Sequence, residues 1–101
     1  MTVYEHRATV TAVAGATAST TLSIPGGRIG QVLIRANTDT TVFRADLTDA
    51  NGLARRHYGY ATHEINDTTL DLPWAGPCTL NITNASPNDT FSILFAVAEG
   101  R

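Results

Sequence analysis

The feature that most constrains this chain is a series of short runs in which apolar and polar residues alternate. Each run ends at a cluster of Gly, Pro, Asn or Asp, as in PGG at 25–27, NTDT at 37–40, DANG at 49–52 and NASPND at 84–89. Alternation with a period of two is typical of β-strands with one buried face, and such clusters are typical of turns. The pattern therefore predicts seven or eight strands and no helix.

The composition favours the same fold class. Threonine is the commonest of the 101 residues, β-branched residues dominate, and helix formers such as Leu, Glu, Lys and Gln are sparse. Short connections suit antiparallel pairing, so we expect one all-β domain over 1–101, either a small antiparallel β-sandwich or a jelly-roll-like barrel. Residues 1–14 precede the compact region, and we expect them to form an extended N-terminal arm or an exchanged edge strand.

The run RIGQVLIRA at 28–36 is more continuously apolar than the others. Such a run is typical of a strand that is covered on both faces. We therefore expect Ile29 and Leu33 in the core, with Val32 and Ile34 as further candidates for burial.

The segment LPWAGPCTLNIT at 72–83 holds the only Trp, the only Cys and two of the four prolines. Because proline fixes φ and lacks an N–H, Pro73 and Pro77 are predicted to lie outside the hydrogen-bonded ladder. Gly76 allows a tight bend between them, so the segment is interpreted as a rigid corner that feeds a core strand. Trp74 then either caps one end of the core or contacts a partner.

The residues that could carry chemistry have simpler structural interpretations. Cys78 lies in the apolar row of its strand, which indicates a buried thiol rather than a nucleophile. His57, His63 and Glu64 show no zinc spacing and are expected on exposed strands. DANG at 49–52 matches a fragment of a calcium loop, but a hairpin turn explains it as well. We predict no catalytic, cofactor or metal site, with calcium at this turn as the alternative.

Charge and cysteine content limit the partners and the compartment. The net charge is −2, all seven basic residues are Arg, and only 16% of residues are charged. We therefore expect no nucleic-acid or membrane partner, and a surface that another protein partly covers. A single Cys forms no internal disulfide, and the first residues lack the apolar run of a signal peptide. Synthesis in the cytoplasm without a signal peptide is the expectation.

Two segments are candidates for protein contact. RRHYGY at 55–60 combines Arg and Tyr, which are enriched at interface hot spots. An edge strand with solvated arginines is the alternative interpretation, and it has equal weight. The second segment is the expected arm. The candidate contact residues are Val3, Tyr4, His6, Arg7, Arg55, Arg56, His57, Tyr58, Tyr60 and Trp74.

The C-terminal half resembles a group of small all-β virion proteins of tailed bacteriophages. Those chains combine a D.NGL-type turn, an AGP.T segment, a strand of the LTVTVSNA kind and a final strand. GGRIGQVLI at 26–34 resembles their early core strand. The matching residues here are Asp49, Asn51, Gly52, Leu53, Ala75, Gly76, Pro77, Thr79 and the stretch 80–85.

The resemblance implies a structural role in a virus particle and no cofactor. It favours a capsid decoration or cement protein, often trimeric, that binds the major capsid protein or copies of itself on the capsid surface. A head–tail connector or tail component is the alternative from the same resemblance. A carbohydrate-binding module for host recognition is a third hypothesis, which needs Trp74, Tyr58 and Tyr60 along one groove.

Overall fold

A computed structural model of the chain describes residues 2–13, 17–83 and 89–99, and within these ranges it contains strands and no helix. All ladders between the strands are antiparallel. This confirms the all-β fold class. The strands are β1 (Thr2–Thr11), β2 (Thr17–Ala36), β3 (Val42–Thr48), β4 (Ala54–Thr62), β5 (Glu64–Asp67), β6 (Leu72–Thr83) and β7 (Thr90–Glu99).

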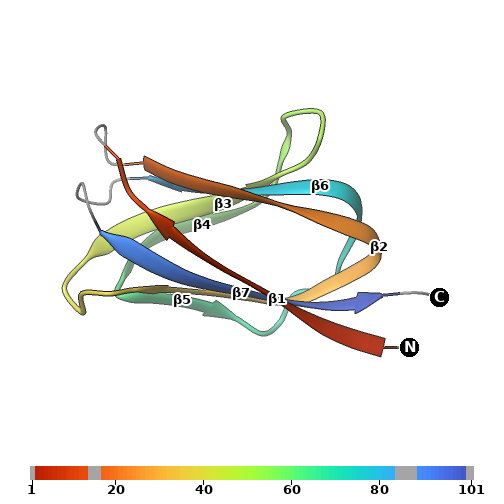
Figure 1. Cartoon of the computed structure of the whole chain (residues 1–101), viewed down its shortest axis with the longest axis horizontal. Coiled ribbons are helices and arrows are strands. Elements are labelled where there is room, and N and C mark those ends of the chain that lie inside the picture. Colours follow the sequence, from red (N-terminus) through yellow and green to blue (C-terminus); the bar gives the residue numbers. More distant parts are fainter. Residues whose placement is uncertain (1, 14–16, 84–88, 100–101) are drawn as a thin grey trace.

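The strands form one sheet that folds over on itself. Its order is β1-β7-β2-β6-β3-β4, and β5 pairs with β2 outside this path. The first part of β2, residues 17–29, pairs with β6, and residues 27–36 pair with β7. As Figure 1 shows, β2 curves from one layer into the other at one end of the molecule. The result is a small sandwich of β2-β6-β3-β4 against β1-β7-β2-β5, with β2 shared by both layers.

The prediction of a turn at 25–27 is wrong, because Thr17–Ala36 is one continuous strand. The ladder to β6 shifts its register between Ile24 and Gly27, and Gly26 has a φ of 127°, which residues with a side chain rarely adopt. A bulge with glycine bends a strand without ending it. The PGG cluster therefore acts as the corner through which β2 passes between the layers.

A second irregularity in β2 decides which of its side chains are buried. Ile29, Val32 and Ile34 are fully buried, but Leu33 is partly exposed, so its predicted burial in the core is wrong. The ladder to β7 shifts between Ile29 and Gln31. The extra residue reverses the alternation, so that Ile29 and Val32 both point inward and Leu33 points outward.

The core lies between the two layers. The aromatic rings of Phe43 and Phe91 meet edge to face, with centroids 5.0 Å apart and an interplanar angle of 66°. Both rings are fully buried, as is Phe95 on the same strand as Phe91. Cys78 is also fully buried, as its place in the apolar row predicts. Its strand neighbours Leu80 and Ile82 complete that row.

The prolines of β6 are not outside the ladder, and that prediction is wrong. Pro73 lies opposite Arg28 and Pro77 opposite Ser23 within the β2–β6 pairing. The ladder to β3 involves only 79–83 of β6, so the earlier part of β6 has one ladder partner in the described structure. A proline is compatible with such a strand when its nitrogen faces the unpaired edge. Gly76 has a φ of 97° there.

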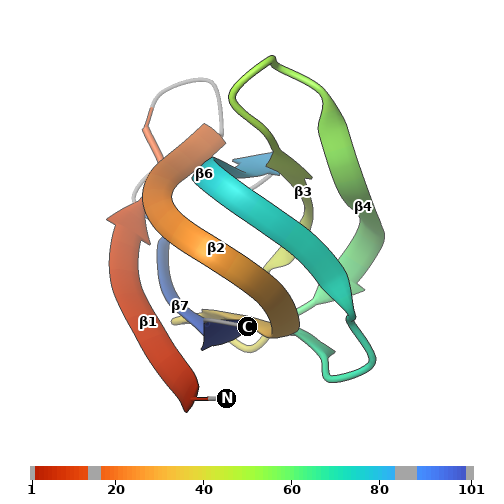
Figure 2. The ribbon, with the colours of Figure 1, turned by 90° about the vertical axis from the view of Figure 1, so that its right-hand side faces the viewer.

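The N-terminal segment forms an edge strand of the same sheet. Every residue of Thr2–Thr11 pairs with β7, and Val13 bridges to Thr17 at the start of β2. Figure 2 shows β1 alongside β2 at one side of the molecule, with β4 at the other. Exchange of this strand with a neighbour stays a prediction, and residues 1 and 14 of the predicted arm lie outside the described residues. So do residues 84–88 of the predicted NASPND turn.

Candidate protein-contact surfaces

The predicted patch at 55–60 lies on β4, an edge strand whose one ladder partner among the described strands is β3. Two bulges interrupt this pairing. Arg55 has no partner between the pairs Leu47–Arg56 and Thr48–Ala54, and Arg44 faces two residues of β4. Because each extra residue reverses the alternation, the patch divides between the two faces of its strand.

Arg56 and Tyr58 turn toward the interior and meet Asp67 at the end of β5. The hydroxyl of Tyr58 donates a hydrogen bond to Oδ2 of Asp67 at 2.9 Å, and Nη2 of Arg56 donates to the same oxygen at 3.1 Å. The Arg56 guanidinium also lies 5.5 Å from the centroid of the Tyr58 ring. Tyr58 packs against the core, so these contacts tie β4 to β5.

Asp67 is the centre of this polar cluster. Its side chain is 10% exposed. Burial alone would raise its pKa, but the hydroxyl and N–H of Thr69 hydrogen-bond Oδ1 at 2.7 and 2.9 Å. Together with Tyr58 and Arg56 they outweigh burial and lower the pKa of Asp67 below its usual 3.8. Burial and the bond to Asp67 raise the pKa of Tyr58. At neutral pH Asp67 is therefore charged and Tyr58 is neutral, and these are the states in which they form the hydrogen bond that joins them.

Arg55 and Trp74 form a second contact within the molecule. The guanidinium of Arg55 lies over the indole, 5.1 Å from the ring centroid, and its Nη2 donates to the carbonyl of Pro73 at 3.4 Å. Trp74 is only 4% exposed, and its Nε1 donates to the carbonyl of Pro77 at 3.1 Å. Of the two roles left open for Trp74, the structure places it in the core, where Arg55 covers the ring.

His57 and Tyr60 are exposed and lie on the opposite face of β4. His57 pairs in register with Asp46, and Tyr60 is 64% exposed. The guanidinium of Arg44 lies 5.5 Å from the centroid of the Tyr60 ring. The six-residue patch is therefore not one surface. His57 and Tyr60 are exposed on the outer face, while Arg55 and Arg56 are exposed and also make contacts within the molecule. Contact of these residues with a partner stays a prediction.

The residues of the expected arm lie on β1. Val3 is 64% exposed and Tyr4 is 48% exposed, whereas His6 is partly buried on the inner face opposite Phe95. Arg7 lies on the outer face, and its Nη2 donates to Oε1 of Glu5 at 2.8 Å. The side chains of Arg7 and Glu5 are 69% and 56% exposed.

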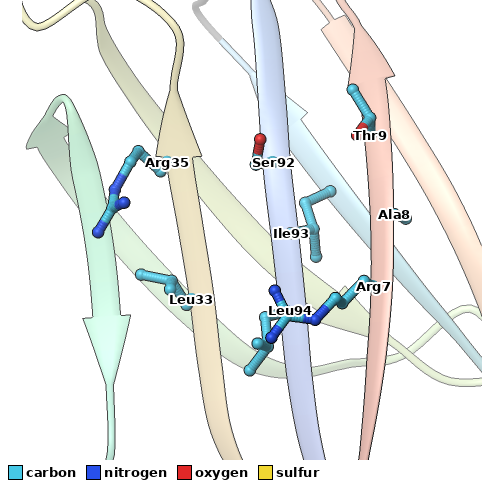
Figure 3. A pocket seen from close by; sticks show the side chains of 8 residues that line it. All are labelled: Arg7, Ala8, Thr9, Leu33, Arg35, Ser92, Ile93 and Leu94. Atoms are coloured by element: carbon cyan, nitrogen blue, oxygen red, sulfur yellow. The ribbon is translucent and has the colours of Figure 1, made fainter.

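An open groove of about 520 Å³ crosses the outer face of β1, β7 and β2. Figure 3 shows Arg7 and Arg35 on its two sides, with Leu33 and Leu94 between them. Arg35 is paired with Glu64 at 2.7 Å. The sequence did not predict this groove, because Leu33 was expected in the core. The signal was present, since Leu33 alternates with the buried Val32 and Ile34. The lining residues are Arg7, Ala8, Thr9, Leu33, Arg35, Ser92, Ile93 and Leu94.

Cys78 and Asp49, two of the residues considered for chemistry, are in ordinary structural positions. Burial raises the pKa of the Cys78 thiol to about 12, which disfavours the reactive thiolate. Asp49 accepts hydrogen bonds from the N–H groups of Asn51 and Leu53 at 2.9 and 3.0 Å, so its carboxylate organises the β3–β4 hairpin turn. Across the part of the chain that the structure describes, no three His, Cys, Asp or Glu side chains cluster as metal ligands would.

His63 has an unusual backbone conformation between β4 and β5. Its φ of 71° lies in the left-handed region, which is uncommon for a residue with a side chain. Its N–H donates to the carbonyl of Thr41 at 2.7 Å, and its carbonyl accepts from the N–H of Ala36 at 2.8 Å. These two backbone bonds account for the strained turn without a ligand.

Comparisons with known proteins leave the family undefined. No protein-family model matches the chain, and no curated protein matches it significantly. Within 2–13, 17–83 and 89–99, no helix has the length and apolar character needed to cross a membrane.

Proposed function

We propose that this chain is a structural virion protein of a tailed bacteriophage, and that it decorates the capsid by binding the major capsid protein. One observation carries the proposal beyond the sequence resemblance. In the described structure, the large exposed hydrophobic side chains all lie on β1, on the β3–β4 hairpin or directly beside them. They are Val3, Tyr4, Val13, Val42, Leu53 and Tyr60. These side chains follow β1 and the β3–β4 hairpin, which lie at the two ends of the strand order, and exposed apolar side chains at both ends favour contact with two neighbours at once.

The mechanism is a linkage between binding and assembly. A protein that binds the assembled lattice, but not the free capsid subunits, stabilises the lattice in proportion to its binding free energy. Contacts at both β1 and β4 would join adjacent capsid subunits, so that the second contact forms at a high effective concentration. Neither contact requires a cofactor or a catalytic step. The chain would act at the capsid surface after its synthesis in the host cytoplasm.

The sugar-binding hypothesis receives no support from the positions of its three aromatic residues. Trp74 is buried under Arg55, and the hydroxyl of Tyr58 is bonded to Asp67. Tyr60 is exposed on the other face of β4. A stacking surface for sugar rings needs exposed aromatic rings along one groove, so we do not propose this function.

Binding to expanded capsids of the same virus tests the proposal. Purified protein is mixed with capsids that lack it, the capsids are sedimented, and the bound fraction is measured. We expect saturable binding, which Tyr4→Ala and Tyr60→Ala each weaken about tenfold if these side chains are contact hot spots. Thr40→Ala, in the exposed loop between β2 and β3, is the matched control. Wild-type protein that stays in the supernatant at all concentrations contradicts the proposal, and binding only to six-fold or twelve-fold rings indicates the connector instead.

A further inference from the structure

The free edge of β1 is an unusually regular surface for adding another strand. All ten residues of Thr2–Thr11 pair with β7 without a register shift, so the opposite edge presents an uninterrupted row of backbone groups. The segment TVYEHRATVT contains no Pro, Gly or Lys. Natural proteins usually protect such edges with bulges, prolines or lysines, because an open edge pairs readily with another chain.

The other edges of the sheet differ from β1. β4 contains two bulges, which disrupt its backbone row. β5 has only four residues. The first part of β2 borders β1, to which it is linked by the bridge between Val13 and Thr17. Among the described strands, β1 therefore has the longest regular edge, which approaches β2 at the Val13–Thr17 bridge just beyond the end of the strand.

The charges on β1 are self-complementary. Glu5 and Arg7 project from the same outer face and are more than half exposed. In an antiparallel pair of two β1 strands centred on His6, Glu5 lies opposite Arg7 of the second copy. By the two-fold symmetry, Arg7 lies opposite Glu5 of that copy. Opposite charges directly across two strands stabilise their pairing.

The same charges disfavour the neighbouring registers. In a two-fold symmetric pair of β1 strands, the second strand can slide only in steps of two residues if each side chain is to stay on its own face of the sheet. The nearest alternatives are therefore centred on Glu5 or on Arg7. They place Glu5 opposite Glu5, or Arg7 opposite Arg7, and like charges directly opposite are destabilising. Only the register centred on His6 brings both opposite-charge pairs together.

The exposed side chains of β1 also fit this register. Tyr4, on the inner face, would lie opposite Ala8 of the second copy, whose small side chain leaves room for the ring. Val3, on the outer face, would lie opposite Thr9. Both Val3 and Tyr4 are highly exposed in the single chain. Strand addition would cover them from two sides by symmetry.

We propose that two copies of this chain associate through antiparallel pairing of β1 with β1, in the register centred on His6, with Glu5–Arg7 ion pairs on either side of the two-fold axis. The two four-stranded layers then join into one continuous sheet across the dimer. This interface and the proposed capsid contact of β1 would both cover Val3 and Tyr4, so a given copy makes one contact or the other, and the two are tested separately. A failure of capsid binding leaves it intact, and a monomeric protein could still bind capsids.

Charge reversal tests both the edge and the register. The mass in solution is measured by light scattering and sedimentation over a range of concentrations, against a chain mass of 10.7 kDa. We expect a dimer of the wild type. Glu5→Arg and Arg7→Glu each place like charges opposite one another twice, and we expect each to weaken the dimer at least about tenfold. The double variant with the charges exchanged should restore it. An equimolar mixture of the two single variants should form a heterodimer, since all its cross-strand pairs are again opposite in charge.

A cross-linking experiment tests the position of the axis independently of charge. His6→Cys places two thiols opposite one another, within the Cα separation of about 4.4–6.8 Å that a disulfide requires. Thr9→Cys is the matched control on the same strand. Its two thiols would lie six residues apart along the strands, about 20 Å, and should not cross-link. Cys78 is buried in both variants.

The results divide clearly. Preferential cross-linking of His6→Cys, with loss and recovery of the dimer in the charge variants, supports the proposal. A wild type that stays monomeric up to about 1 mM overturns it, since an interface of that weakness is not a specific one. A dimer that survives both single charge reversals, a closed trimer, or equal cross-linking of the two cysteine variants also overturns it. In those cases the free edge would instead be available to an extended segment of another protein.

Discussion

Replacing Asp67 by Asn tests whether the polar cluster between β4 and β5 holds these strands together. The carboxylate accepts four hydrogen bonds, two at Oδ2 from Arg56 and Tyr58 and two at Oδ1 from Thr69. An amide keeps one acceptor oxygen and turns an NH₂ group toward two of these donors. Two bonds to a charged acceptor are lost, and each contributes about 1.5–3 kcal/mol. Because Arg56 and Thr69 are partly or fully exposed to water, we expect Asp67→Asn to cost about 2–3 kcal/mol.

Urea and thermal unfolding measure this cost. For a domain of this size, the expected loss lowers the unfolding temperature on the order of 10–20 °C. Asp71→Asn is the matched control, since Asp71 pairs with Arg28 at 3.0 Å but its side chain is 76% exposed. That change should cost less than about 1 kcal/mol. Equal losses for the two variants would refute the assignment of Asp67 as a structural centre.

The dependence on pH gives a second test of the same group. The pKa of Asp67 is lowered in the folded state, so its charge stabilises the fold above the unfolded pKa near 3.8. This contribution is lost as the pH falls through the lower folded value. The difference in stability between the wild type and Asp67→Asn should therefore be full above about pH 5 and shrink below pH 4. A difference that stays constant from pH 7 to pH 3 would show that the charge of Asp67 does not stabilise the fold.

Three further predictions concern single residues. Cys78 should resist alkylation at pH 8 in the native protein and react in denaturant, because burial raises its pKa to about 12; rapid native labelling would show that the site opens. Gly76→Ala should cost about 1–2 kcal/mol from backbone strain alone, since a Cβ there meets no atom within 4 Å but φ is 97°. Gly59→Ala, which also meets no atom within 4 Å and has no positive φ, is its control and should not destabilise the protein in urea unfolding. Arg55→Ala should shift the fluorescence of Trp74 to longer wavelength, because the guanidinium that covers the indole is removed; an unchanged spectrum would show that Arg55 does not shield the ring.

The candidate contact surfaces show where local sequence is insufficient. From the sequence alone, the six consecutive residues 55–60 are expected to form one contact surface. The bulges opposite β3 divide it, sending Arg56 and Tyr58 inward and leaving Tyr60 outside. Asp67 completes the inner cluster from β5, and its turn-like sequence context gives no sign of this role. A bulge depends on the partner strand, so the pattern of one strand does not reveal it.

The sequence by itself determined the properties that depend on short-range chemistry. Alternation placed Cys78 in a buried row, because successive side chains of a strand point to opposite faces. The Asn-Gly pair in DANG at 49–52 predicted a hairpin turn, and the turn forms with Gly52 at a φ of 81° and with Asp49 accepting the hydrogen bond from Asn51. These outcomes need no knowledge of distant strands.

Only the tertiary structure decided whether the breaks between runs were turns or bends. PGG at 25–27 remains within β2 because β6 and β7 supply ladder partners on either side of it. Pro73 and Pro77 remain within β6 because β2 pairs with them from one edge. Leu33 faces outward because the register shift near Gly30 reverses the alternation. In each case a strand distant in sequence sets the hydrogen bonding and the register. These decide whether a glycine or a proline ends a strand or lies within it.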